Sequence, residues 1–243
     1  MPYRRLPNTD LARIYALKKA VEMEGYRERG ELVLSYQITQ EAAQFLNKFQ
    51  RAQKKYQQCN DLHLASSKTY RKELVVARMY VLHFIQVLNM TIQRGELRKE
   101  IKSAYGLGPD KFSNPDLSSE QGLLEWGERI IKAEEERTSK GGVPIYNPTI
   151  AKVKVHWQAF NEHYFNQKIL RENVAKSLDE VTAMRPQADD IILDIWNQVE
   201  SFYSDLTIEE RMSKCKPFGL IYYYRSSEKA KKMAEGVQHS IDF

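Results

Sequence analysis

The sequence predicts an all-α fold, an up-and-down bundle of about six helices. Two observations carry this prediction. Apolar side chains recur at alternating spacings of three and four residues along most of the chain, which is the period of an amphipathic helix. Strict alternation of apolar and polar residues, the pattern of a half-buried strand, is confined to short runs at residues 31–36 and 220–224.

Each expected helix has its own apolar stripe and its own boundaries. The first is expected to begin at Asn8 or Thr9, because both residues are good N-caps. Residues 64–69, "LASSKT", are expected to form a loop, and Pro186 is expected to separate two helices because proline lacks a backbone N–H. The helix at 74–92 is apolar around most of its circumference and is expected at the centre of the bundle. The expected helices cover residues 9–25, 38–63, 74–92, 120–137, 147–181 and 189–206.

The chain is long enough to bury a substantial core, and residues 1–243 are expected to form a single helical domain. A faint internal repeat, with an offset of about 113 residues, predicts two diverged three-helix units at 6–107 and 117–224. A basic C-terminal tail, residues 225–243, follows the second unit.

An aromatic-Gly-Leu triplet follows a charged helix end in both repeat units, at residues 105–107 and 218–220. Glycine in the left-handed conformation is the commonest helix stop. Gly106 and Gly219 are therefore expected to cap the helices that precede them.

Three consecutive tyrosines follow the second triplet, and they raise the question of whether they form a binding site or a packing surface. Neighbouring side chains of an extended segment point to opposite faces. Tyr222 and Tyr224 are therefore expected to pack on the bundle, while Tyr223 meets water beside Arg225.

Charge and cysteine content favour a cytoplasmic protein without a membrane anchor. The 37 Lys and Arg residues against 32 Asp and Glu give a formal net charge of +5, and the basic residues are spread among acids. Two cysteines are too few for a disulfide framework and favour a reducing compartment. The most hydrophobic stretch, 74–92, has about the length of a membrane span. Four polar residues interrupt it, and each would be costly in lipid: Arg78, His83, Gln86 and Asn89.

The motifs of common active sites and cofactor sites are absent from the sequence. No Glu-x-x-His pair, nucleophile elbow or phosphate-binding glycine loop occurs. Cys59 and His63 share a helix face, but two ligands without a second pair are weak evidence for a metal. No catalytic residue, metal or cofactor is expected, and the chain is expected not to be an enzyme.

A basic row and the C-terminal aromatic segment form the candidate interaction surface. Lys48, Arg51 and Lys55 recur at i, i+3 and i+7 along the second expected helix, and Tyr223 and Arg225 place a ring beside a cation. Such a row can meet phosphates, and exposed rings can stack on bases. The leading function is nevertheless a non-enzymatic helical interaction or structural protein whose partner is another protein or a second copy in a homodimer. Nucleic-acid binding is the alternative.

A second candidate site is the polar stripe of Arg78, Gln86 and Asn89 within the helix at 74–92. A buried arginine requires a partner, which is either another protein group or a ligand. This stripe supports a further alternative, a ligand-binding or enzymatic bundle.

Overall fold

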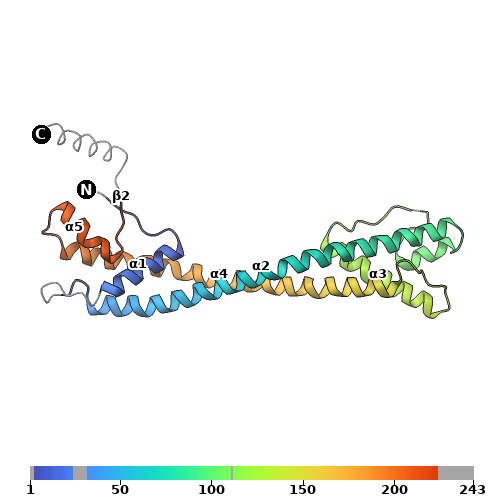
Figure 1. The fold of residues 1–243 in the computed structure, drawn as a ribbon, viewed down its shortest axis with the longest axis horizontal. Helices are drawn as coiled ribbons and strands as arrows, with labels where there is room; N and C mark the ends of the chain where they lie inside the picture. The colour runs from blue at the N-terminus through green and yellow to red at the C-terminus, as the bar shows by residue number, and fades with distance from the viewer. Residues whose placement is uncertain (1–2, 24–31, 111, 224–243) are drawn as a thin grey trace, which may run out of the picture. The chain divides into compact units, whose positions relative to one another are not determined.

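The computed structural model describes residues 3–23, 32–110 and 112–223 (Figure 1). Within these residues the chain forms five α-helices, two short 3-10 helices and two two-residue strands. The elements are β1 (Tyr3–Arg4), α1 (Asp10–Met23), α2 (Tyr36–Gln93), η1 (Lys99–Tyr105), α3 (Glu120–Ser139), α4 (Ile150–Phe202), α5 (Ile208–Cys215), η2 (Lys216–Phe218) and β2 (Tyr222–Tyr223). The predicted fold class, an all-α helical bundle, is confirmed.

The loop expected at residues 64–69 is wrong, because α2 runs through it without interruption. The hydroxyl of Ser67 donates to the carbonyl oxygen of His63 at 2.8 Å, so it bonds to the preceding turn of the helix. Amide groups of α4 also reach this stretch, and Gln167 Nε2 lies 3.4 Å from Ser67 Oγ. Contacts with a neighbouring helix therefore override the low helix propensity of the serines.

The helix boundary expected at Pro186 is also wrong, because Pro186 lies inside α4. Proline removes one hydrogen bond from the helix ladder. Packing on both sides of it compensates, because Val181 and Ala188 are fully buried. The guanidinium of Arg185 is also held by the carboxylate of Asp10, at 2.8 and 2.9 Å.

The two expected extended runs differ in outcome. The described part of the first, 32–36, is a bend that leads into α2 at Tyr36, so the strand expected there is wrong. The second contains β2, which pairs antiparallel with β1. In this ladder Tyr3 is opposite Tyr223 and Arg4 is opposite Tyr222.

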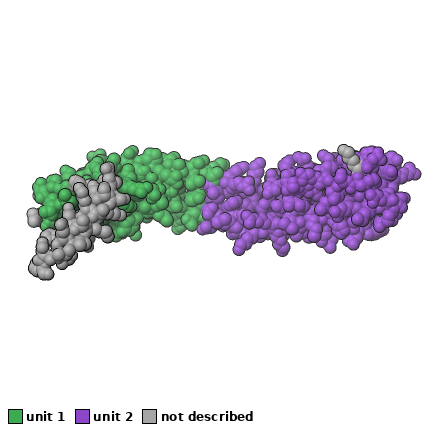
Figure 2. All heavy atoms as spheres, turned by 90° about the horizontal axis from the view of Figure 1, so that it is seen from above, with its two compact units in different colours: residues 1–58, 175–243 green, residues 59–174 purple. Residues whose placement is uncertain are grey.

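The chain divides into two compact units (Figure 2). Unit 1 consists of residues 1–58 and 175–243, and unit 2 consists of residues 59–174. Both long helices contribute to both units. The expected single domain and the expected repeat remain predictions.

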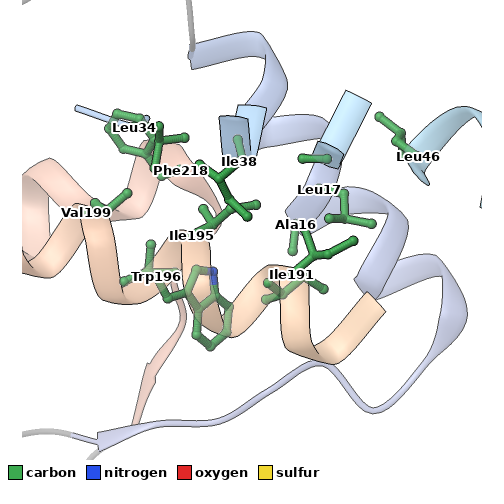
Figure 3. Packing of buried hydrophobic residues seen from close by; sticks show 14 of the residues in the cluster. Ala16, Leu17, Leu34, Ile38, Leu46, Ile191, Ile195, Trp196, Val199 and Phe218 are labelled. Atoms are coloured by element: carbon green, nitrogen blue, oxygen red, sulfur yellow. The ribbon is translucent and has the colours of Figure 1, made fainter. Parts of the chain in front are cut away.

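The core of unit 1 forms where α1 packs on the first part of α2 and the last part of α4. Figure 3 shows Ile191 of α4 beside Ala16 of α1, and Ile195 of α4 beside Ile38 of α2. The large buried side chains of this core are Leu17, Phe45, Phe49, Ile192, Trp196, Tyr203 and Phe218.

Polar contacts set the direction of α2 and α4 in unit 1. The backbone N–H of Ser35 donates to Gln198 Oε1 at 2.9 Å, and Lys55 Nζ lies 2.8 Å from Glu180 Oε1. Rising residue numbers on α2 thus meet falling numbers on α4, so the two helices are antiparallel. On α1, Arg13 makes two hydrogen bonds to the carboxylate of Asp189, at 2.8 and 2.9 Å. Such two-bonded arginine pairs fix geometry as well as adding energy.

The tyrosine segment lies at the edge of the unit 1 core. The Tyr222 side chain is half-buried, and its hydroxyl donates to Glu200 Oε1 at 2.8 Å. Burial, with the hydrogen bonds to Cys215 and Glu200, raises the pKa of Tyr222. Tyr223 is 42% exposed. The expected orientations of Tyr222 and Tyr223 are confirmed, and Tyr224 lies outside the described residues.

Unit 2 has a second core, built from the rest of α2, the first part of α4, α3 and η1. Aromatic contacts join the two long helices: Tyr70 stacks on Phe160 with ring centroids 6.2 Å apart, and Tyr80 stacks on His156 at 4.2 Å. The fully buried side chains of this core include Val81, Phe84, Ile85, Leu88, Tyr105, Leu123, Ile130 and Val153. As in unit 1, the pairing is antiparallel.

A buried carboxylate, that of Glu134 in α3, ties η1 and the 143–145 segment to α3. Arg137 donates to it twice, each time at 2.8 Å, and the N–H of Ile145 donates at 3.2 Å. The hydroxyl of Tyr105 donates to the same carboxylate. Burial alone would raise the pKa of Glu134, but the hydrogen bonds from Arg137, Tyr105 and Ile145 together lower it. Glu134 is therefore held ionised inside the core.

Both expected glycine caps are confirmed. Gly106 follows η1 with a φ of 71°, and Gly219 follows η2 with a φ of 85°. A third glycine, Gly95, has a φ of 79° just after α2. These angles lie in the left-handed region that favours glycine.

Glu134→Gln is expected to lower the free energy of unfolding by roughly 3–5 kcal/mol, because it leaves the Arg137 guanidinium without its carboxylate. The substitution is also expected to reduce the loss of stability in acid. Since folding lowers the pKa of Glu134 below 4.5, its contribution is present above that pH and is lost as the pH falls through the folded-state pKa. Denaturant unfolding measured across a pH series checks both effects.

The matched control is Glu135→Gln, at an exposed carboxylate that pairs with Lys154. Its cost is expected to stay below about 1 kcal/mol, as for other surface ion pairs. Equal losses of unfolding free energy in Glu134→Gln and Glu135→Gln would contradict the stabilising role of the buried Glu134 carboxylate.

Substitution of each capping glycine by alanine separates backbone strain from crowding. Gly95→Ala is expected to cost about 1 kcal/mol, because a new Cβ there meets nothing within 4 Å and only the positive φ is unfavourable. Gly106→Ala is expected to cost a similar amount, since the nearby Arg129 side chain can move. Gly219→Ala is expected to cost at least about 2 kcal/mol, because its Cβ would lie 3.0 Å from the Cα of Ala16. Three equal values from equilibrium unfolding would contradict the crowding at Gly219.

The tyrosines are expected to differ in their contribution to stability. Tyr222→Phe should lower the free energy of unfolding by about 1–2 kcal/mol, because it removes the hydrogen bond to Glu200, and Tyr222→Ala should lower it further. Tyr223→Ala should change it by less than about 0.5 kcal/mol, as expected for an exposed side chain. Thermal melts check this order, and an equal loss in Tyr222→Ala and Tyr223→Ala would refute it.

Candidate functional site

The basic row expected on α2 is only partly available to a partner. Lys48 and Arg51 are exposed, but Lys55 is paired with Glu180 on α4. Tyr223 is exposed on β2, and within the described part of the chain no hydrogen bond or ion pair joins it to this row. Arg225 lies outside the described residues.

The residues of the expected polar stripe have different surroundings. Arg78 and Gln86 are half-buried and line an open hollow of about 390 Å³ on the surface of α2. Arg78 Nη2 donates to the backbone carbonyl of Ser118 at 3.0 Å, so its partner includes the protein's own backbone. Asn89 is 95% buried, and its Oδ1 has no hydrogen-bond partner among the described residues.

The hollow is lined by apolar side chains that lie on the solvent side of α2. Val75, Met79 and Leu82 line it together with His83. Val75 is 62% exposed and Met79 is 54% exposed, and Met90, further along the helix, is 54% exposed. The expectation that residues 74–92 lie at the centre of a bundle is therefore wrong, because this helix buries one face and leaves an apolar stripe on another.

These side chains belong to one continuous surface, which we call the outer face of α2. Positions 68, 72, 75, 79, 82 and 86 are alternately four and three residues apart, so they share one side of the helix. Arg71, Arg78 and His83 lie beside this row, and Met90 extends it. The outer face of α2 consists of Lys68, Arg71, Lys72, Val75, Arg78, Met79, Leu82, His83, Gln86 and Met90.

The apolar spacing alone does not reveal the exposed stripe, because this stripe shares a helix with a core stripe. The buried stripe includes Ala77, Val81, Phe84, Ile85 and Leu88. A helix with apolar residues on two faces resembles one that is buried on all sides. The distinguishing sign was available in the sequence, since the row through Val75 continues into lysines at its N-terminal end, where a buried face would stay apolar.

A second hollow, of about 460 Å³, lies in unit 2 near the C-terminal end of α2. Val87, Leu97 and Ile145 form apolar parts of its wall. Arg94 and Glu96 also line it and pair with each other at 2.8 Å, which leaves little net charge for a ligand. The hollow thus offers an apolar surface without a nucleophile activated by a neighbouring base.

The described residues contain no cluster of metal ligands, and one of their helices is long and apolar. In that part of the chain, no group of three or more His, Cys, Asp or Glu side chains is placed to hold a metal ion. One described helix, α2, is long and apolar enough to cross a membrane by length and composition alone, with a mean hydropathy of 1.4 in its most apolar window. The core helix of a soluble protein meets the same criteria, and 39% of this window is buried.

The outer face of α2 therefore has the chemistry of a binding surface: apolar side chains in the middle and cations along the edges. Such surfaces bury apolar area on association and use charge to select the partner. No known protein family, curated protein or solved structure matches this chain.

Proposed function

We propose that this chain is a non-enzymatic helical interaction protein that binds another protein through the outer face of α2. The observation that carries the proposal is the exposure of Val75, Met79 and Met90, each more than half accessible, along one side of a helix. Burying an aliphatic side chain contributes roughly 1.5–3 kcal/mol. Three such side chains in one row supply a substantial part of the affinity that a specific complex needs.

Three of the groups with shifted pKa values lie in hydrogen-bonded pairs, which favours a structural role for them. The hydroxyl of Tyr105 donates a hydrogen bond to Glu134 in the core of unit 2, and the hydroxyl of Tyr222 donates one to Glu200 in unit 1. Groups that satisfy each other inside a core stabilise the fold and are not free to transfer protons to a substrate. The two cysteines are free thiols, which supports the cytoplasm as the expected compartment.

Nucleic-acid binding through the basic row of Lys48, Arg51 and Lys55 is the alternative function. The ion pair of Lys55 with Glu180 favours protein binding over this alternative, because it places a carboxylate where phosphates would have to lie. Because of this ion pair, we prefer the outer face of α2 to the basic row as the binding site.

Site-specific photo-crosslinking tests the proposed function. The crosslinker p-benzoylphenylalanine is introduced at Met79 in the cells that make this protein, and at Tyr36 as the matched control. Tyr36 is an exposed, large side chain of α2 outside the outer face. A discrete adduct is expected from position 79 and not from position 36, and mass spectrometry identifies the partner, which is another protein or a second copy of the chain.

Binding of the identified partner to the purified protein completes the test. Val75→Asp is expected to weaken this binding by at least about tenfold, the effect of roughly 1.4 kcal/mol, because it buries a charge in the interface. Thermal melts should show an unchanged fold, since Val75 is exposed. Identical adducts from positions 79 and 36, or equal affinities of wild type and Val75→Asp, would overturn the proposed function.

A further inference from the structure

The apolar stripe on the outer face of α2 is bordered by positive charges that have no carboxylate partner among the described residues. These cations are Lys68, Arg71, Lys72 and Arg78. Some other cations of the long helices do have carboxylate partners: Lys55 pairs with Glu180 on the facing helix, and Lys154 pairs with Glu135 on α3. The outer face is thus a site of uncompensated positive charge.

The local sequence gives this face no acid of its own. Between Asp61 and Glu96 the chain contains one acid, Glu73. Glu73 precedes Val75 by two residues, which places it roughly 200° around the helix axis and away from the outer face. A partner that brings carboxylates to this face would therefore meet no acid of α2 on it.

The spacing of the side chains favours a helix as the occupant. The row from Lys68 to Gln86 has the alternating four and three spacing of a coiled-coil seam. Arg71 and Arg78 are seven residues apart and so run along one edge of that seam, two turns from each other. A helix laid over Val75 and Met79 would place its own flanking residues beside both arginines.

We propose that the outer face of α2 binds an acidic amphipathic helix of a protein partner. This inference rests on the proposed function and adds the chemistry of the partner. Apolar side chains of that helix cover Val75, Met79 and Leu82, and its flanking Glu or Asp residues pair with Arg71 and Arg78. Helix-in-groove recognition of this kind uses apolar anchors for affinity and charges for specificity.

Other occupants fit this surface less well. A second copy of the chain would present the same cationic face, so a symmetric dimer through it would bring like charges together. Single-stranded nucleic acid is bound by stacking on exposed rings, and the outer face contains no Phe, Tyr or Trp. A membrane surface favours long apolar faces rich in Trp and Phe, whereas this stripe consists of Val, Leu and Met.

Two synthetic helical peptides serve as probes. Both carry leucines alternately three and four residues apart. The flanking positions are glutamate in the acidic peptide and lysine in the basic peptide. Fluorescence anisotropy with the full chain is expected to show that the acidic peptide binds at least about tenfold tighter than the basic one. Added salt is expected to reduce this difference, because it screens exposed charges.

Charge reversal of the chain supplies the decisive comparison. Arg71→Glu combined with Lys72→Glu is expected to weaken binding of the acidic peptide and to strengthen binding of the basic peptide, each by about tenfold. The matched control combines Lys48→Glu with Arg51→Glu, which makes the same charge change at exposed positions elsewhere on α2. The control is expected to leave both affinities unchanged within about twofold. Met79→Ser is expected to weaken binding of both peptides, because it removes an apolar contact.

The outcomes separate failure of this inference from failure of the proposed function. Equal binding of both peptides that is lost in Met79→Ser would overturn the acidic partner and leave the apolar surface intact. Binding of neither peptide would overturn the inference, while the crosslinking result decides the proposed function. Single-stranded RNA or anionic phosphatidylserine vesicles could instead bind more tightly than the acidic peptide. If the charge reversal at Arg71 and Lys72 abolished that binding, the result would overturn the inference in favour of that ligand. Self-association lost in Met79→Ser by sedimentation velocity would identify a second copy as the occupant.

Discussion

The antiparallel pairing of α2 with α4 is the interaction on which the rest of each unit depends. A pair of helices buries one stripe of each and leaves wide flanks in water. A stable core therefore needs a third element over the groove between them. In unit 1 this element is α1, held by the arginine–carboxylate pairs of Arg13 and Arg185. In unit 2 it is α3 with η1, which the buried carboxylate of Glu134 joins to each other.

The same constraint explains why an apolar surface remains on α2. The third element covers one side of the helix pair, and in unit 2 the side that carries Val75 and Met79 is left exposed. Soluble proteins rarely expose contiguous apolar rows without a function, because such rows promote association. The cations beside the row favour its hydration in the free protein, and they are the basis on which we propose a negatively charged partner.

Part of this arrangement was accessible from the residues alone. The 3/4 spacing of apolar side chains reports how each helix turns, so the fold class followed from it. The left-handed caps at Gly106 and Gly219 followed as well, since a helix end beside an aromatic-Gly-Leu triplet needs a residue without a Cβ. Arg78 and Gln86 are polar residues in an apolar stretch of sequence, and both line the hollow on α2.

By itself, the sequence determined the helical periods, the glycine stops and the acid-poor stretch around Val75, because these depend on side chains close together in the chain. Only the tertiary structure decided that α2 continues through Ser67 and α4 through Pro186, because contacts between the two helices outweigh the local preference to break. It also decided which apolar stripe of α2 is core and which is surface. Burial depends on which neighbour covers a face, and that neighbour, α3, lies far away in the sequence.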